Sequence, residues 1–210
     1  MANWTVDKSK ILQPDEIRRL LDDLARKGHR SLNTRMNRVI FRLSTCCGLR
    51  ASEISQITLA DIQVDSSQPK IRIRREVGKG RRRRKVPLHW DAGTLSDLRD
   101  WKRFRREHGA DDDARFVCSQ HRDSLGNVLD RRNLRKRFKV CCKCLGPERQ
   151  AELTIHDGRH SFISHVLHSG RSIVEAREAA GHSSIGTTSL YAHLVEDDDE
   201  TVGNLFKFDG

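Results

Sequence analysis

The residues best suited to chemistry in this sequence are a single tyrosine, two arginines far apart in the chain, and two histidines. Tyr191 is the only tyrosine and lies nine residues after His182. His156 and Arg159 are three residues apart, so on a helix both side chains face the same way. Arg50 supplies a second guanidinium from a Gly-Leu-Arg-Ala-Ser-Glu segment. This set predicts phosphoryl transfer, because paired arginine forks hold phosphate oxygens in the geometry of the transition state.

Each member of the set has an expected part in a reaction that needs no metal or other cofactor. Tyr191 is the expected nucleophile, although a free phenol with a pKa near 10 is ionised only about one part in a thousand at neutral pH. Nearby cations must therefore favour the phenolate as it forms. Lys79, a mobile cation expected at the tip of a hairpin, completes the set and is expected to give a proton to the leaving 5′ oxygen. His156 and His182 are expected to hydrogen-bond the phosphate or to assist proton movement.

Taken alone, Tyr191 has an ordinary interpretation. A lone tyrosine near a C-terminal helix is usually a half-buried side chain with its hydroxyl hydrogen-bonded. The assignment as nucleophile therefore depends on the two arginines and two histidines that accompany it.

The elements that must position these residues are mostly helical. Hydrophobic periodicity predicts helices over residues 14–27, 31–47, 49–54, 94–108, 133–145, 156–167, 173–180 and 184–192. From Lys70 the period changes to two, and a Gly-Lys-Gly turn puts Lys79 at the tip of a β-hairpin that returns through Leu88. A further short strand is predicted over 115–118. The expected fold is mainly α with a small antiparallel β-sheet, that is, α+β.

The charge balance indicates an anionic polymer as partner. Lys and Arg number 40 against 29 Asp and Glu, giving a formal net charge of +11 and a pI near 9.8. Such an excess attracts polyanions, and double-stranded DNA is the first partner to consider. An anionic membrane surface would satisfy the same balance, but no apolar run approaches the ~18 residues of a spanning helix, and no signal peptide or lipidation motif is evident. We therefore expect a cytoplasmic, DNA-associated protein.

Two stretches carry most of the positive charge. Residues 72–85 hold nine Arg or Lys against one acid, and residues 131–139 hold six more. Four adjacent arginines repel one another unless an anion is present, which favours phosphate contact. The residues predicted to contact DNA phosphates are Arg81, Arg82, Arg83, Arg84, Arg131, Arg132 and Arg135.

The six cysteines are expected to be reduced thiols. Four of them form two adjacent pairs, which make a poor disulfide framework, and the other features of the sequence indicate a protein that stays inside the cell. A zinc cluster of Cys141, Cys142 and Cys144 with a histidine lacks the usual separated pair of C-x-x-C knuckles, so buried helical thiols are the expected state. A zinc module using His156, His160, Cys141 and Cys144 is the alternative, and no metal is expected.

Five motifs in this order resemble the tyrosine recombinase, or phage integrase, family. They are Gly48-Leu-Arg-Ala-Ser-Glu53, Gly78-Lys-Gly80 followed by Val86-Pro-Leu88, His156-x-x-Arg-His160, Gly181-His182 and Tyr191. The resemblance implies the catalytic-domain fold of that family, attack by Tyr191 to give a 3′-phosphotyrosyl link, and attack of the freed 5′ hydroxyl on a partner strand. It implies that neither ATP nor a metal is used. It also implies that Glu53 and Asp157 support neighbouring residues rather than react, and that the protein assembles as a tetramer on paired sites.

The expected organisation is a lead-in over residues 1–12, a catalytic domain over 13–194 and a tail over 195–210. In the resembling family the C-terminal segment commonly docks on a neighbouring subunit, so Leu205, Phe206 and Phe208 are expected to do so. Family members usually carry a further helical domain before the catalytic one. The sequence thus resembles short, catalytic-domain-only members such as fimbrial phase-switch invertases, or a fragment. Gly158 stands where the family often has leucine.

Two other functions remain open at this point. A type IB topoisomerase uses a very similar set of Arg, Lys, His and Tyr residues, and a non-enzymatic DNA-binding regulator would need only the basic surface.

Overall fold

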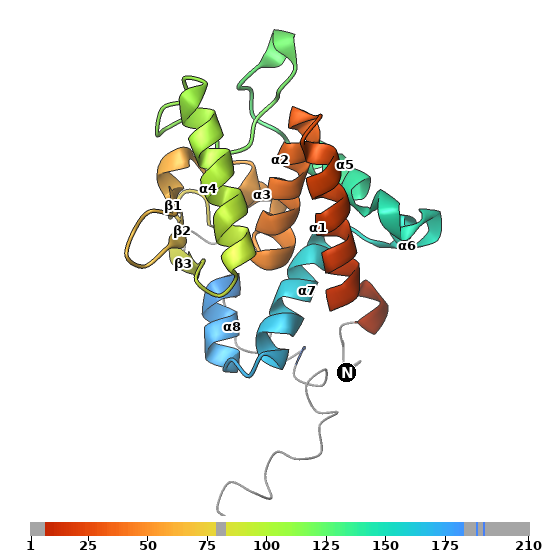
Figure 1. The fold of residues 1–210 in the computed structure, drawn as a ribbon. Coiled ribbons are helices and arrows are strands. Elements are labelled where there is room, and N and C mark those ends of the chain that lie inside the picture. Colours follow the sequence, from red (N-terminus) through yellow and green to blue (C-terminus); the bar gives the residue numbers. More distant parts are fainter. Residues whose placement is uncertain (1–6, 79–82, 183–187, 189–190, 192–210) are drawn as a thin grey trace, which may run out of the picture.

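Helices make up most of the fold, and a three-stranded antiparallel sheet in the order β1-β2-β3 lies beside them (Figure 1). The computed structural model describes residues 7–78, 83–182, 188 and 191. Its helices are α1 (Pro14–Gly28), α2 (Leu32–Phe41), α3 (Ala51–Ile54), α4 (Ala92–Glu107), α5 (Arg131–Cys141), α6 (Pro147–Glu152), α7 (Ile155–His168) and α8 (Ile173–Ala180). Its strands are β1 (Ile62–Gln63), β2 (Lys70–Ile73) and β3 (Arg84–Pro87). The predicted fold class is confirmed.

The two helices that carry the C-terminal site residues both begin at side-chain caps. At the start of α7 the backbone N–H and hydroxyl of Thr154 each donate to Asp157 Oδ2 at 2.7 Å. At the start of α8, Ser172 N–H donates to Glu175 Oε2 at 2.9 Å and the serine hydroxyl accepts from the Glu175 N–H. These capping boxes satisfy backbone donors that the first turn leaves unpaired, and so fix where each helix begins.

The sheet positions the base of the hairpin by strict alternation. Ile71 pairs with Val86 and both are fully buried, whereas the neighbouring pair Arg72 and Lys85 is exposed. The same register places Arg84 opposite Ile73, on the buried side of the strand. The hairpin tip, including Lys79, lies outside the described residues.

Apolar side chains form two clusters. The larger one joins α1, α2, α4, α5 and the sheet around Phe41, Trp101 and Phe138. The smaller one lies between α7 and α8, and Tyr191, only 3% exposed, packs into it. The ring of Tyr191 is therefore held by the packing of these two helices.

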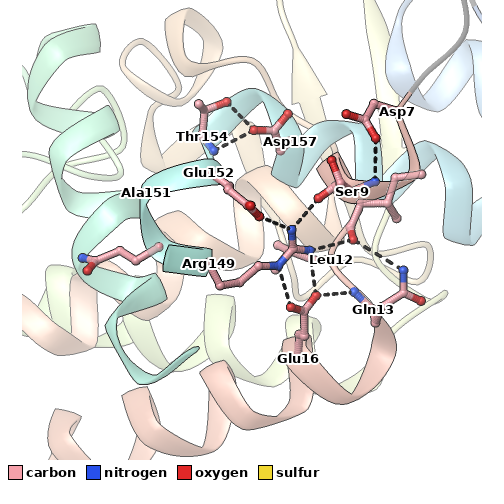
Figure 2. A network of polar contacts seen from close by, with 12 residues as sticks. Asp7, Ser9, Leu12, Gln13, Glu16, Arg149, Ala151, Glu152, Thr154 and Asp157 are labelled. Carbon is pink, nitrogen blue, oxygen red and sulfur yellow. Dashed lines mark hydrogen bonds and ion pairs between the residues drawn. The ribbon is translucent and has the colours of Figure 1, made fainter. Parts of the chain in front are cut away.

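The described end of the expected lead-in packs on the same domain. Leu12 is fully buried, its N–H donates to Ser161 Oγ at 2.8 Å, and its carbonyl meets His165 Nε2 at 2.8 Å. Arg149 of α6 reaches across to Glu16 of α1, with Nε to Oε1 at 2.7 Å, and to backbone carbonyls before α1 (Figure 2). Residues 7–12 are thereby fastened to α6 and α7.

The predicted helix over 31–47 proves to be two pieces. α2 ends at Phe41 and the chain continues as a π-helix over Arg42–Cys46, with Cys47 N–H bonded to the Arg42 carbonyl at 3.0 Å. This segment packs closely on α7. A Cβ at Gly158 would lie 2.6 Å from Thr45 Oγ1, so the glycine found where the family often has leucine permits this contact.

Two further predictions of local structure need correction, and one helix was missed. The strand predicted over 115–118 is wrong: Arg115 and Cys118 form only isolated bridges, with Thr58 and Val128. The helix predicted over 133–145 begins earlier, at the Asp130 cap, and turns into a 3-10 segment at Cys142. The short α6, which starts with a proline in its first turn, was not predicted. The helix expected over 184–192 lies almost entirely outside the described residues.

Candidate active site

Arg50 and Arg159, 109 positions apart in the sequence, bring their guanidinium groups to the same end of α8. Arg50 Nη2 donates to the carbonyl of Gly181 at 3.1 Å, and Arg159 Nη2 donates to the carbonyl of Ala180 at 2.5 Å. The two acceptors are consecutive residues at the C-terminus of the helix, where the helix dipole favours positive charge. The structure thus brings together the two arginines that the sequence paired.

Two glycines make this convergence possible. Gly48 has φ of 64° and its carbonyl accepts from Arg159 Nη1, while a Cβ there would lie 2.3 Å from the Phe162 ring. Gly181 has φ of 68° and ends α8 in the left-handed conformation. Residues that carry a Cβ rarely adopt this left-handed backbone conformation, so both turns depend on glycine.

One buried carboxylate organises the arginine side of the site. Glu53 is fully buried and accepts from the backbone N–H of Arg50 at 2.8 Å and from its Nη1 at 3.1 Å. It also accepts two bonds from Arg84, at 2.6 and 2.7 Å. Burial alone would raise the pKa of Glu53, but the hydrogen bonds and charges of Arg84 and Arg50 outweigh burial and hold that pKa below its usual value.

The prediction that Arg84 contacts DNA phosphate needs correction. Its side chain is only 8% exposed and its guanidinium is paired with Glu53, because β3 turns position 84 inward. Neighbouring Arg83 is exposed, and Arg81 and Arg82 lie outside the described residues. Sequence alone did not separate the buried member of the four-arginine run from the rest.

His182 is placed to offer a hydrogen bond to a ligand. Burial is the main cause that lowers its pKa to about 3, and the positive charges of Arg159 and Arg50 act in the same direction. The ring is therefore neutral at physiological pH. Its Nδ1 lies 3.0 Å from the hydroxyl of Thr188, a fully buried residue. If the threonine donates, Nδ1 is the acceptor and the ring proton is on Nε2, which is then free to donate.

The hydroxyl of Tyr191 is in hydrogen-bond contact with Nδ1 of His160. Burial raises the pKa of Tyr191 to about 12, with Arg159 opposing the shift, and burial lowers the pKa of His160. A neutral imidazole therefore meets a protonated phenol. From the sequence, His160 is named in a motif and in the zinc alternative but is given no catalytic role; its position four residues after His156, on the same helical face, is the signal that would have found this contact.

The other predicted site residues lie around this group. His156 is an exposed residue near Arg135 of α5. Partial desolvation of its ring and the positive charge of Arg135 lower its pKa. Arg131, Arg132 and Arg135 are exposed on α5. Asp157 caps α7, the helix that carries His156 and Arg159, and its side chain accepts hydrogen bonds from Thr154 rather than from either arginine.

Because Tyr191 is the only tyrosine, its ionisation can be followed directly by the ultraviolet absorbance of the phenolate. At pH 11 a phenol with an ordinary pKa near 10 is about nine-tenths ionised, whereas Tyr191 should be mostly protonated. The protein unfolded in urea is the control and should titrate near pH 10. Since the folded-state pKa is the higher one, stability should fall as the pH rises from about 10 to about 12. A folded protein that titrates like the unfolded one would contradict the burial of the ring.

The structure also bears on the zinc and membrane alternatives. Within residues 7–78 and 83–182, no group of three or more His, Cys, Asp or Glu side chains lies close enough to hold a metal ion, so the four zinc candidates do not form a site. All six cysteines are free. None of the described helices is both long and apolar enough to cross a membrane.

Comparison with known proteins places the chain among the integrases. The phage integrase family matches residues 10–197. The chain is 29% identical over 185 residues to tyrosine recombinase XerC of Shewanella amazonensis, covering 88% of this chain and 56% of the relative. It is 30% identical over 186 residues to XerC of Escherichia coli O157:H7, with the same two coverages. The chain thus spans about half the length of these curated relatives.

Solved structures share the fold at low sequence identity. XerA recombinase superimposes with a TM-score of 0.69 at 22% identity, over 90% of this chain and 59% of its own. XerH bound to palindromic difH gives 0.69 at 24%, over 89% and 50%. The catalytic domain of bacteriophage HP1 integrase gives 0.54 at 22%, over 93% and 95%. With a family match across most of its length and the fold of these enzymes, the chain belongs to the phage integrase family.

Proposed function

We propose that this chain cleaves and rejoins DNA strands at specific sites through a covalent 3′-phosphotyrosine intermediate at Tyr191. The observation that carries the proposal is the meeting of Arg50 and Arg159 at the end of α8, beside His182. Glu53 is the one carboxylate, among the described residues, that hydrogen-bonds to the guanidinium groups of Arg50 and Arg84, and Arg159 bonds only to carbonyls. Three positive charges against one negative charge favour an anionic ligand such as a DNA phosphate.

The proposed reaction proceeds by in-line displacement at phosphorus. The Tyr191 oxygen forms a bond to phosphorus as the phenol proton passes to Nδ1 of His160, and the bond from phosphorus to the 5′ oxygen breaks. Lys79 supplies the proton that the leaving 5′ oxygen takes. Arg50, Arg159 and the Nε2–H of His182 hold the non-bridging oxygens as charge gathers on them. A 5′ hydroxyl then attacks the phosphotyrosine and releases Tyr191, so the bond energy is kept and no ATP is needed.

The relatives named above are recombinases, which favours strand exchange over the relaxation of supercoils by a topoisomerase or simple binding by a regulator. We infer that the protein works in the cytoplasm on double-stranded DNA, as four copies on paired sites. The tail with Leu205, Phe206 and Phe208 lies outside the described residues, and we propose that it docks on the neighbouring copy. Truncation after Asp199 should then prevent assembly on DNA.

A covalent adduct is the direct test of the proposal. A library of duplexes with a randomised core would be enriched by binding to the protein and rebuilt as nicked suicide substrates, from which the cleaved fragment diffuses away. The expected result is a protein–DNA species that survives a denaturing gel. Binding to the enriched duplexes with no such species would leave only a DNA-binding protein.

The exposed arginines of α5 should set the salt dependence of DNA binding. Replacing Arg131, Arg132 and Arg135 by Gln should reduce the slope of log K against log salt by about 2 to 3, because each phosphate contact contributes about 0.9. The measurement is a fluorescence-anisotropy titration at several salt concentrations. The matched control replaces Arg99, Arg103 and Arg106 of α4, which pair with Asp65, Asp100 and Asp112. Equal changes in both variants would show an effect of net charge alone.

A further inference from the structure

Arg84 connects three elements of the active site through all of its guanidinium nitrogens. Nη1 and Nη2 donate to the two oxygens of Glu53 on α3, at 2.6 and 2.7 Å. Nε donates to the carbonyl of Ala179 in the last turn of α8, at 2.9 Å. The side chain also fills the space beside Gly181, where a Cβ would lie 2.6 Å from its Cδ. One residue of β3 thus links the arginine side of the site to the end of α8.

Glu53 is the group through which Arg84 reaches Arg50. Oε1 accepts from Nη1 of both arginines, and Oε2 accepts from the Arg50 backbone N–H and from Arg84 Nη2. A carboxylate with all its acceptor positions filled and no exposure has one orientation available. That orientation fixes the guanidinium of Arg50, whose side chain is still 19% exposed and can reach a phosphate.

We propose that Arg84 is a positioning residue for strand cleavage, acting through Glu53 to set the fork of Arg50 and through Ala179 to fix the end of α8 before His182. This inference rests on the proposed function. In this role Arg84 does not contact DNA. The preceding residue, Arg83, is exposed and is still predicted to contact a DNA phosphate.

A consequence for pH follows from the surroundings of Glu53. The charged groups that face it are Arg50, the N-cap residue of its own helix, Arg84 from β3 and Arg159 from α7. Removing the charge of Arg84 leaves a buried carboxyl with one hydrogen-bonded cation, so its pKa should rise towards neutrality. Once protonated, Glu53 cannot accept from Arg50 at both oxygens, and the fork of Arg50 is released. Cleavage should then fail as the pH falls through this raised pKa.

The test is single-turnover cleavage of the suicide duplex from pH 5.5 to pH 9, for the wild type, Arg84→Gln and Arg84→Lys. We expect Arg84→Gln to move the acidic limb of the profile up by at least about one pH unit, with about tenfold or greater loss at low pH and partial recovery at high pH. Arg84→Lys keeps the charge and should restore the acidic limb, with a modest loss at every pH because the two-pronged bond is gone.

The matched control is Arg42→Gln. Arg42 is a buried arginine, 9% exposed at the side chain, that pairs with Asp91 and Asp97 away from the site. The Arg42→Gln variant should lower the stability of the fold without moving the pH profile of cleavage. If Arg84→Gln does not fold, the double variant Glu53→Gln with Arg84→Gln replaces the ion pair by two amides, and its profile should lack the raised limb.

The outcomes separate this inference from the function on which it rests. A wild-type protein that forms no adduct would overturn the proposed function. A wild type that cleaves, with an Arg84→Gln profile parallel to that of the wild type or of Arg42→Gln, would overturn the role of Arg84 alone. A raised limb that persists in the double variant would show that Glu53 is not the group concerned.

Discussion

Tyr191→Phe should abolish the covalent protein–DNA adduct while leaving DNA binding within about twofold of the wild type. The variant loses one oxygen, and that oxygen is the proposed nucleophile. We expect the single-turnover rate to fall by more than about a thousandfold, since removal of a nucleophile leaves no other route to the intermediate. Adduct formation is measured on denaturing gels, and binding is measured by anisotropy.

The fold should tolerate this change. The ring of Tyr191 packs in the cluster between α7 and α8, and phenylalanine keeps that packing. The variant loses one hydrogen bond, the one between the tyrosine hydroxyl and His160. His160→Ala is the useful companion, because it removes the same hydrogen bond and keeps the phenol. If the phenylalanine variant still traps DNA, Tyr191 is not the nucleophile.

The second large effect is expected for Arg50→Lys. Charge is kept, but an ammonium cannot reproduce the planar fork that bonds Glu53 and Gly181 and that we propose also holds the phosphate. Loss of a hydrogen-bond donor to the transition state typically costs about 100- to 1,000-fold in rate. Single-turnover cleavage at saturating DNA should therefore fall by that order, with little change in the affinity for DNA.

Arg149→Lys is the control for the effect of exchanging a paired, part-buried arginine. Its side chain is 21% exposed, close to the 19% of Arg50, and it bonds Glu16 and Glu152 rather than a residue of the candidate site (Figure 2). It should reduce thermal stability and leave the cleavage rate of the folded protein unchanged. Equal loss of cleavage in both lysine variants would assign the effect of Arg50→Lys to folding.

Much of the fold and of the site was predictable from the sequence because local rules specify them. The helix that carries His156 and Arg159 begins at a Thr-to-Asp capping box, and α8 ends at a glycine. The alternation of Ile71 and Ile73 with arginines predicted the hairpin of β2 and β3 and its buried face, whereas β1 was not predicted. Resemblance to a known family supplied the link between Arg50 and the distant C-terminal motifs.

What sequence reasoning missed depends on tertiary contacts. Arg84 pairs with Glu53, 31 residues away, and that contact cannot be read from the sequence. Alternation back from the buried Val86 does place position 84 on the inner face of the strand, and the run of four arginines obscured this signal. The contact between His160 and Tyr191 depends on how α7 packs against the segment after α8. The π-helical segment after α2 likewise follows from close packing on α7 at Gly158, and helical periodicity alone does not predict it.

The central claim is that one phenol attacks a DNA phosphate held by guanidinium groups from two distant segments. The most direct measurement digests the trapped adduct with nuclease and protease and locates the remaining nucleotide by mass spectrometry. We predict a nucleotide joined through its 3′ phosphate to the peptide that contains Tyr191. A nucleotide on any other residue, or one joined through a 5′ phosphate, would contradict the account.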